Sequence, residues 1–381
     1  MRIGIFGGSF DPVHKEHVRL AEAAINGLKL DKLIVMPAGI PPHKAEKKRA
    51  DAIDRLHMCE IAFRNIRHAE VSDYEILQEG KSYTYLTCLH FSQLYPNAQL
   101  FWLVGTDMFW DFFNWKNPTV ILSCAKLAVC RRDESEDNVI EEQKAFQKEF
   151  SQKFETIPYN GAPVSSTEIR LRSILGLDFS EFVPSGVAAY IRENNLYRIS
   201  AIDEGLSLEK TSRAEHSRRV CLMAMSSARR LHLDETKTLW AAALHDVAKN
   251  LSTDDIRLKG FVPPEGVPAP VMHQYEGAYV LENTFFVTDE DVLNAVRYHT
   301  SGRPNMSMLE KLVFLSDLLE PARNFPHVDE LRLLFYRDID ECIYKSLLYQ
   351  IEYLKTTETP IYPLTIEAFE YYEQKIKGEN K

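Results

Sequence analysis

The feature that most constrains this 381-residue chain is a change of pattern near residue 200. Before that point, short apolar runs of strand length alternate with helical patterns. The runs are residues 3–6, 33–36, 100–104 and 127–130. Strands that alternate with helices along a chain favour a mostly parallel, doubly wound α/β sheet.

After about residue 197 the strand signal fades and helical patterns follow one another, interrupted by a Pro- and Gly-containing breaker at residues 263–268. The helical patterns are residues 216–231, 236–249, 289–299, 308–320, 329–335 and 338–356. Because the two patterns are segregated, we predict two domains. They are an α/β domain at residues 1–198 and an all-α domain at residues 214–381, joined by a linker at residues 199–213.

The composition is that of an ordinary globular protein, with 45% hydrophobic and 26% charged residues. The net charge of −10 argues against a nucleic-acid partner, so any polyanionic substrate needs local basic groups and metal ions. The six cysteines form no CxxC pair, which favours reduced thiols. Without a signal-peptide core or a membrane-length apolar run, we expect a soluble cytoplasmic protein. The oligomeric state stays open, a homo-oligomer included.

The sequence GGSFDPVHKEH at residues 7–17 directly follows the first strand and leads into the first helix. Gly7 and Gly8 let the backbone turn sharply, and the helix start offers unpaired N–H groups to an anion. His14 and His17 are three residues apart, so they share one face of that helix. Open α/β sheets bind nucleotides at such a junction, although neither common nucleotide fingerprint is present. The alternative is a tight turn with two surface histidines.

Residues 7–17 resemble the GxFxPxHxGH motif of the nucleotidylyltransferase superfamily. The chain is most similar to the bacterial nicotinate-nucleotide adenylyltransferase family, over residues 1 to about 198, which implies a Rossmann-like domain. Further matching segments, in the same order, are PAGIPPHK (37–44), KSYT (81–84), GTD (105–107), WK (115–116) and SSTEIR (165–170). Glu16 departs from the motif, which has Gly there. The helix dipole favours a carboxylate in the first turn, so we expect Glu16 to face solvent. The alternative is that it faces the ATP site, where it would repel phosphate and compromise turnover.

Adenylyl transfer needs no protein nucleophile, so we expect catalysis by positioning and by stabilisation of phosphate charge. His14 and His17 can donate to phosphate oxygens, Lys44 and Arg170 supply fixed positive charge, and Mg²⁺ accompanies ATP. The resemblance implies a nucleotide-binding loop formed by Gly7, Gly8, Ser9 and Phe10.

By the same resemblance, Trp115 stacks on the pyridine ring of the acceptor mononucleotide, with a core tryptophan as the alternative. Ser166 and Thr167 lie just before a predicted helix, where their hydroxyls can cap it or contact phosphate. The residues that the resemblance assigns to ribose are Gly105 and Asp107, and to the nicotinate end Ser82, Tyr83 and Thr84.

In the second half, His245 and Asp246 follow an apolar run on a predicted helix. A fold that buries an imidazole next to a carboxylate must satisfy both, and a bound metal ion does so. His216 lies on the preceding helix, and Asp317 ends another apolar run. The donor types suit iron, manganese or zinc, and the metal would activate a water molecule for attack on phosphorus.

The H…HD…D pattern is similar to the HD-domain metal-dependent phosphohydrolases. His273 and His299 resemble the extra ligands of members that hold two metals, with a surface histidine as the alternative for His273. Residues 299–304 and 308–320 look like the bacterial symmetrical diadenosine tetraphosphate hydrolases. The substrate-binding or catalytic residues implied for this domain are Lys249, Thr300 and Arg303.

Together these patterns predict a bifunctional enzyme. The first domain would make nicotinate adenine dinucleotide from ATP and nicotinate mononucleotide, for NAD synthesis. The second would split diadenosine tetraphosphate into two ADP. The alternatives are an adenylyltransferase for nicotinamide mononucleotide or phosphopantetheine, with a non-catalytic, nucleotide-sensing HD domain. Acid or amide preference, metal identity and coupling between the activities stay open.

Overall fold

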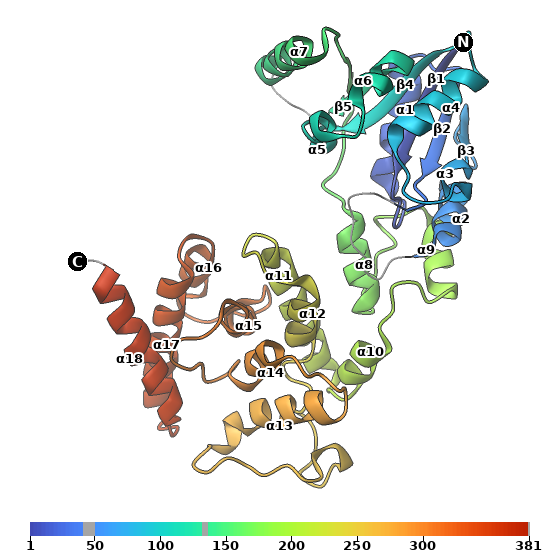
Figure 1. Cartoon of the computed structure of the whole chain (residues 1–381). Helices are drawn as coiled ribbons and strands as arrows, with labels where there is room; N and C mark the ends of the chain where they lie inside the picture. The colour runs from blue at the N-terminus through green and yellow to red at the C-terminus, as the bar shows by residue number, and fades with distance from the viewer. Residues whose placement is uncertain (41–49, 132–135, 380–381) are drawn as a thin grey trace. The chain divides into compact units, whose positions relative to one another are not determined.

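The computed structural model describes residues 1–40, 50–131 and 136–379. These residues form two compact units, Met1–Arg198 and Ile199–Lys381. Figure 1 shows the first unit in blue to green and the second in yellow-green to red.

The first unit contains a six-stranded, all-parallel sheet with the strand order β3-β2-β1-β4-β5-β6. The strands are β1 (Arg2–Gly8), β2 (Lys32–Pro37), β3 (Ala69–Val71), β4 (Gln99–Gly105), β5 (Ala125–Arg131) and β6 (Glu155–Pro158). The doubly wound parallel sheet is confirmed. The short edge strands β3 and β6 were not among the predicted runs. The strand order reverses between β1 and β4, which is where such sheets bind ligands.

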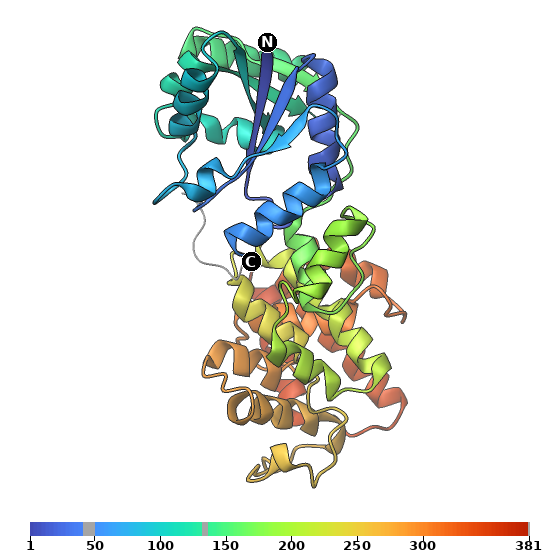
Figure 2. The same cartoon turned by 90° about the vertical axis from the view of Figure 1, so that its right-hand side faces the viewer.

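The sheet is covered on both faces because successive side chains of each strand point to opposite sides. On β1, Ile3 and Ile5 belong to one core cluster and Phe6 to the other. The Phe6 face is covered by α1 (Lys15–Gly27), α2 (Ala52–Phe63), α8 (Ser166–Ile174) and α9 (Ser185–Glu193). The opposite face is covered by α4 (Thr84–Leu94), α5 (Thr106–Phe109), η1 (Asp111–Asn114), α6 (Pro118–Cys124) and α7 (Glu136–Phe150). Figure 2 shows helices on both sides of the strands, and the short α3 (Tyr74–Leu77) follows β3.

The regular elements of the second unit, within its described residues, are all helices. Its helices are α10 (Ser200–Ser207), α11 (Thr211–Ala228), α12 (Glu235–Ala243), η2 (Ile256–Leu258), α13 (Ala269–Asn283), α14 (Glu290–Arg297), α15 (Met308–Leu319), α16 (Val328–Arg337), α17 (Ile339–Thr356) and α18 (Pro363–Glu379). Helix α11 packs against α12 and α15, and α14 packs against α13 and α15. Among the described residues, none of the helices has both the length and the apolar character needed to cross a membrane.

The segment 199–213, expected to be a linker, is largely helical. Ile202 and Leu206 of α10 are buried, four residues apart on one helix face. Gly205 lets this helix pack closely against Leu244 of the same unit, since an added Cβ would lie 2.4 Å from a methyl carbon of Leu244. The segment expected to be a linker is thus packed as part of the second unit.

Candidate functional sites

The loop after β1 lies beside the reversal point of the sheet. An added Cβ on Gly7 would lie 2.6 Å from the ring of Trp102, so glycine is needed for the close approach of backbone and indole. Phe10 has a positive φ of 48°, which turns the chain sharply before α1. The neighbouring strand β4 ends at Gly105. The exposed residue Asp107 follows it in α5, so its carboxylate lies at the same edge of the sheet.

His14 and His17 form a capping box at the start of α1. The backbone N–H of His17 donates to Nδ1 of His14 (3.4 Å), and that of His14 donates to Nδ1 of His17 (3.2 Å). The rings stack with their centroids 3.7 Å apart. Because each Nδ1 accepts, a neutral ring carries its proton on Nε2. Both histidines can therefore donate from Nε2 to an anion at this helix start.

Helix α8 packs its first turn against the same loop. Its N-cap is Ser165, whose hydroxyl accepts from the N–H of Glu168. Ser166 is the first helical residue and its hydroxyl donates to the carbonyl of Pro12 (2.9 Å). Arg170 donates to the carbonyl of Asp11 (2.6 Å) and to the hydroxyl of Thr167 (3.1 Å). These two contacts with the first loop join residues that are 154 and 159 positions apart in the chain.

The prediction that Glu16 faces solvent is wrong. Its side chain is 2% exposed. One carboxylate oxygen accepts from the backbone N–H of Ala162 (2.8 Å), and the other forms an ion pair with Arg19 (2.5 Å). A buried carboxylate is tolerated because both oxygens have strong partners.

The residues expected to contact the nicotinate end of the acceptor lie at and just before the start of α4. The hydroxyl of Ser82 accepts from the N–H of Gly39 (3.0 Å), and Thr84 begins α4. The ammonium of Lys116 lies 4.2 Å from the ring centre of Tyr83. Ser82 and Tyr83 help to line a cavity of about 310 Å³.

Trp115 is half-buried, with its ring 5.3 Å from Phe112 and 6.5 Å from Trp102, centroid to centroid. Its indole is therefore anchored against the core and partly accessible, and its stacking role stays a prediction. Lys44 lies outside the described residues.

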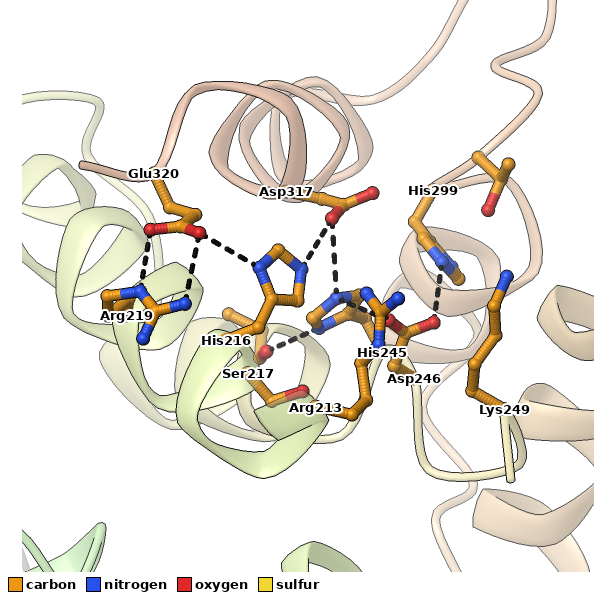
Figure 3. Close-up of polar contacts among 12 residues, drawn as sticks. Arg213, His216, Ser217, Arg219, His245, Asp246, Lys249, His299, Asp317 and Glu320 are labelled. Carbon is orange, nitrogen blue, oxygen red and sulfur yellow. Dashed lines mark hydrogen bonds and ion pairs between the residues drawn. The ribbon is translucent and has the colours of Figure 1, made fainter. Parts of the chain in front are cut away.

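In the second unit, side chains from separate helices converge (Figure 3). His216 comes from α11 and Asp317 from α15, and His216 Nε2 lies 2.7 Å from Asp317 Oδ1. His245 Nε2 lies 3.5 Å from Asp246 Oδ2 and 3.8 Å from Asp317 Oδ1. The predicted helix over residues 236–249 ends earlier, at Ala243. His245 and Asp246 lie in the turns that follow, where Lys249 N–H donates to the Asp246 carbonyl.

The Nδ1 atoms of three histidines contact acceptors away from this cluster. His245 Nδ1 donates to the carbonyl of Ala242 (2.9 Å), and His299 Nδ1 donates to the carbonyl of Val296 (2.8 Å). His216 Nδ1 lies 3.1 Å from a carboxylate oxygen of Glu320. Because a carbonyl only accepts, the first two rings present an unprotonated Nε2 to the cluster when neutral. This arrangement is typical of metal-binding histidines.

Asp246 lies between two groups of histidines. Its Oδ2 faces His245, whereas its Oδ1 lies 3.3 Å from His273 Nε2 and 3.5 Å from His299 Nε2. The hydroxyl of Thr300 lies 3.1 Å from His273 Nε2. Burial, assisted by His299, lowers the pKa of His273 to about 3, whereas for His245 the effect of burial is outweighed by Asp246 and Asp317, which raise its pKa to about 9. One carboxylate thus faces two candidate metal positions.

Two buried atoms of this centre have no hydrogen-bond partner in the described part of the chain, His245 Nε2 and Asp246 Oδ1. Ligand atoms of His216, His245 and Asp317 lie within 4.8 Å of one another, as do those of His245, Asp246 and His299. A divalent cation would satisfy both atoms, and imidazole with carboxylate is a donor set for iron, manganese or zinc. The residues present therefore fit a metal centre.

Cationic side chains surround this centre, two of which the sequence analysis missed. Arg213 Nη1 lies 2.9 Å from Asp246 Oδ2, and Arg323 Nη2 lies 2.9 Å from Asp317 Oδ1. Lys249 Nζ lies 3.0 Å from His273 Nδ1. Burial lowers the pKa of Lys249, with Asp246 opposing and Arg213 adding to the shift. The available signal was the position of Arg213, one helical turn before His216 on α11.

Arg303 contacts a different partner. Its guanidinium donates to both carboxylate oxygens of Glu310, at 2.8 and 3.0 Å, and lies 5.1 Å from the ring centre of Tyr298. Glu310 is also the third residue of α15 and completes its capping box with Ser307. The contacts of Arg303 thus hold the start of α15, and its role in substrate binding stays a prediction.

The fold and the two sites define a nucleotidylyltransferase-like α/β domain followed by a helical domain with an HD-type metal centre. The cytidylyltransferase-like family matches residues 5–172, and the HD domain family matches residues 213–322. A protein of Clostridium tetani named "probable nicotinate-nucleotide adenylyltransferase" is 38% identical over 195 residues, which are 51% of this chain and 98% of that protein. The chain therefore belongs to the nicotinate-nucleotide adenylyltransferase family and carries an HD hydrolase domain as well; it is an enzyme.

Two further proteins are similar to larger or other parts of the chain. A Mycoplasma genitalium protein named "probable nicotinate-nucleotide adenylyltransferase/Ap4A hydrolase" is 28% identical over 330 residues, covering 84% of this chain and 88% of its own. A Clostridium acetobutylicum crystal structure described as a "predicted HD superfamily hydrolase involved in NAD metabolism" is 30% identical, with a TM-score of 0.42. The match covers 46% of this chain and 97% of that one.

Proposed function

We propose that the chain is a bifunctional enzyme. Its first unit transfers the adenylyl group of ATP to nicotinate mononucleotide, giving nicotinate adenine dinucleotide and pyrophosphate for NAD synthesis. Its second unit hydrolyses diadenosine tetraphosphate to two ADP. The observation that carries the proposal is the match of 84% of this chain to 88% of the Mycoplasma genitalium protein, whose name joins both activities.

In the first unit, a phosphate oxygen of the acceptor attacks the α-phosphorus of ATP, and pyrophosphate leaves. His14 and His17 donate from Nε2 to phosphate oxygens whose charge grows during the transfer. Arg170, held on the Asp11 carbonyl, adds a positive charge beside the same loop. ATP enters with Mg²⁺, which shares the neutralisation of the phosphates.

In the second unit, the residues that would hold one divalent metal are His216, His245, Asp246 and Asp317. Asp246 with His273 and His299 would hold a second. A bound metal polarises a phosphate and lowers the pKa of water. Lys249, Arg213 and Arg323 bind the phosphate chain, with Thr300 beside His273. The oxygen of water adds to a phosphorus next to the central bridging oxygen, whose bond breaks, so that each product keeps two phosphates.

Product analysis of the intact chain tests both halves. It is incubated with ATP and a panel of nicotinate mononucleotide, nicotinamide mononucleotide and phosphopantetheine. In parallel it is incubated with dinucleoside polyphosphates and iron, manganese or zinc. We expect nicotinate adenine dinucleotide from the first panel and ADP alone from diadenosine tetraphosphate. Activity only with phosphopantetheine would refute the first assignment. ATP plus AMP, or bound metal without any hydrolysis, would refute the second.

Acceptor choice is a sharper test of the first unit. A site built to hydrogen-bond a carboxylate leaves donors unpaired when the amide binds, so nicotinate mononucleotide should exceed the amide in kcat/KM by roughly tenfold or more. The measurement is initial-rate kinetics with both acceptors at saturating ATP. Equal kcat/KM values would contradict a carboxylate-selective site around Ser82, Tyr83 and Thr84.

A further inference from the structure

Glu16 stands between the two histidines of the first unit, at a position where the resembling motif has glycine. It is the second residue of α1 and is 2% exposed. A charged side chain in such a place costs free energy unless its partners are fixed. Its partners are fixed: Oε2 accepts from the N–H of Ala162 (2.8 Å), and Oε1 pairs with Arg19 (2.5 Å).

Ala162 belongs to the segment that connects β6 to α8, and that segment leads into Ser166 and Arg170. These two residues already contact the first loop, through the Pro12 and Asp11 carbonyls. The Glu16–Ala162 hydrogen bond adds a third connection, on the N-terminal side of the α8 cap. Three contacts therefore join residues 11–16 to residues 162–170, and both segments carry groups assigned to phosphate.

We propose that Glu16 is a positioning residue for adenylyl transfer, which holds the segment leading into α8 against α1 and so fixes Arg170 relative to His17. The inference rests on the adenylyl-transfer function proposed above. It gives the carboxylate a role that glycine at this position cannot perform.

The carboxylate has a second effect of opposite sign. It lies in the first turn of α1, where the positive end of the helix dipole also attracts phosphate, so its charge weakens the attraction for ATP. The ion pair with Arg19 offsets part of this charge. Glu16→Gln separates the two effects, because glutamine keeps an oxygen that can accept from Ala162 and loses the charge. Glu16→Gly removes both.

The experiment compares Glu16→Gly, Glu16→Gln and the matched control Glu22→Gly in the full-length chain. Glu22 is exposed on the same helix, so its replacement reproduces the helix-propensity loss without the Ala162 contact. For each variant, kcat and KM for ATP, ATP binding by calorimetry, thermal unfolding and amide exchange of Ala162 are measured. Diadenosine tetraphosphate hydrolysis serves as an internal reference for protein integrity.

We expect Glu16→Gly to lower kcat/KM for ATP by roughly threefold to tenfold, the range for one lost hydrogen bond, with a raised KM and faster exchange at Ala162. Glu16→Gln and Glu22→Gly should stay within about twofold of the wild type. Equal kinetics for Glu16→Gly and the wild type would overturn the proposal. So would a gain in both Glu16 variants, or lower thermal stability with unchanged kinetics. If the wild type makes no dinucleotide, the proposed function fails, and ATP binding with Ala162 exchange still decides the role of Glu16.

Discussion

The two units build their proposed phosphate-binding sites in opposite ways. In the first unit, glycines, backbone N–H groups and two imidazoles lie within one loop and one helix turn, residues 7–17. In the second unit, buried imidazoles and carboxylates come from residues spread between Arg213 and Arg323. The first site is made by local backbone geometry, and the second by the packing of several helices.

The two sites also differ in which of their buried polar groups have hydrogen-bond partners. His14 and His17 satisfy each other's backbone N–H groups, and the buried Oδ2 of Asp11, which has no hydrogen-bond partner among the described residues, lies 3.9 Å from the cationic Arg170. His245 Nε2 and Asp246 Oδ1 are buried without hydrogen-bond partners among the residues described. Unpaired buried polar atoms cost free energy. The second site should therefore depend on a cation for stability as well as chemistry, whereas the first should not.

The largest effect is expected from Asp246→Ala. Because Asp246 faces both candidate metal positions, its loss should lower metal affinity more than 100-fold and bring hydrolysis to background. Adenylyl transfer should be unchanged. The measurements are metal content by mass spectrometry and chromatography of both products.

The matched control is Asp255→Ala, which removes a carboxylate paired with Arg257 outside the centre. It should keep metal and both activities. If Asp246→Ala binds no metal and still hydrolyses diadenosine tetraphosphate, the hypothesis of metal-dependent hydrolysis is refuted. A simultaneous loss of adenylyl transfer would show that the two sites are not independent.

His17→Ala is the reciprocal experiment in the first unit. Losing one donor to a transition-state oxygen should lower kcat for adenylyl transfer by about 100-fold or more, while hydrolysis continues at the wild-type rate. His57→Ala, at an exposed position of α2, is the control and should change neither activity strongly. An unchanged kcat in His17→Ala would refute the assignment of the first loop to adenylyl transfer.

The contrast between a local site and one assembled by helix packing explains how much of each unit could be predicted from the sequence. The strands β1, β2, β4 and β5 were predicted because buried parallel strands are continuous apolar runs, whereas β3 and β6 are too short for such a signal. The loop at residues 7–17 was predicted because its elements are contiguous. Glu16 was misplaced because its partner Ala162 is 146 residues away, and no local pattern reveals such a contact.

In the second unit, the resemblance supplied the candidate ligands, and the structure brings them together. The turn at His245 and Asp246 was predicted as helix because the apolar run before it continues the helical pattern up to Leu244. Arg213 and Arg323 were missed because an arginine is normally a solvated surface residue. Only the fold places these two beside Asp246 and Asp317.

A smaller effect is expected from Arg213→Met and Arg323→Met, which keep the apolar stem and remove the charge. Each should raise KM for diadenosine tetraphosphate by about 10-fold to 100-fold, the range for lost charge-assisted hydrogen bonds, with metal content retained. Arg257→Met removes a carboxylate-paired arginine elsewhere and should leave KM unchanged. Loss of metal in the first two variants would instead assign the arginines to holding the metal ligands.

The smallest expected effect is a change in stability on metal removal, measured by calorimetric unfolding without nucleotide. A ligand that binds only the folded state at about 100 times its Kd stabilises it by roughly 2.7 kcal/mol. For a unit of this size that corresponds to roughly 5–10 °C in Tm. A chelator should therefore lower the unfolding transition of the second unit and leave that of the first in place, since only the second contains His245 Nε2 and Asp246 Oδ1. Asp246→Ala should not respond to the chelator. Equal shifts of both transitions, or none in the wild type, would contradict the expectation that only the second unit needs a metal cation for its stability.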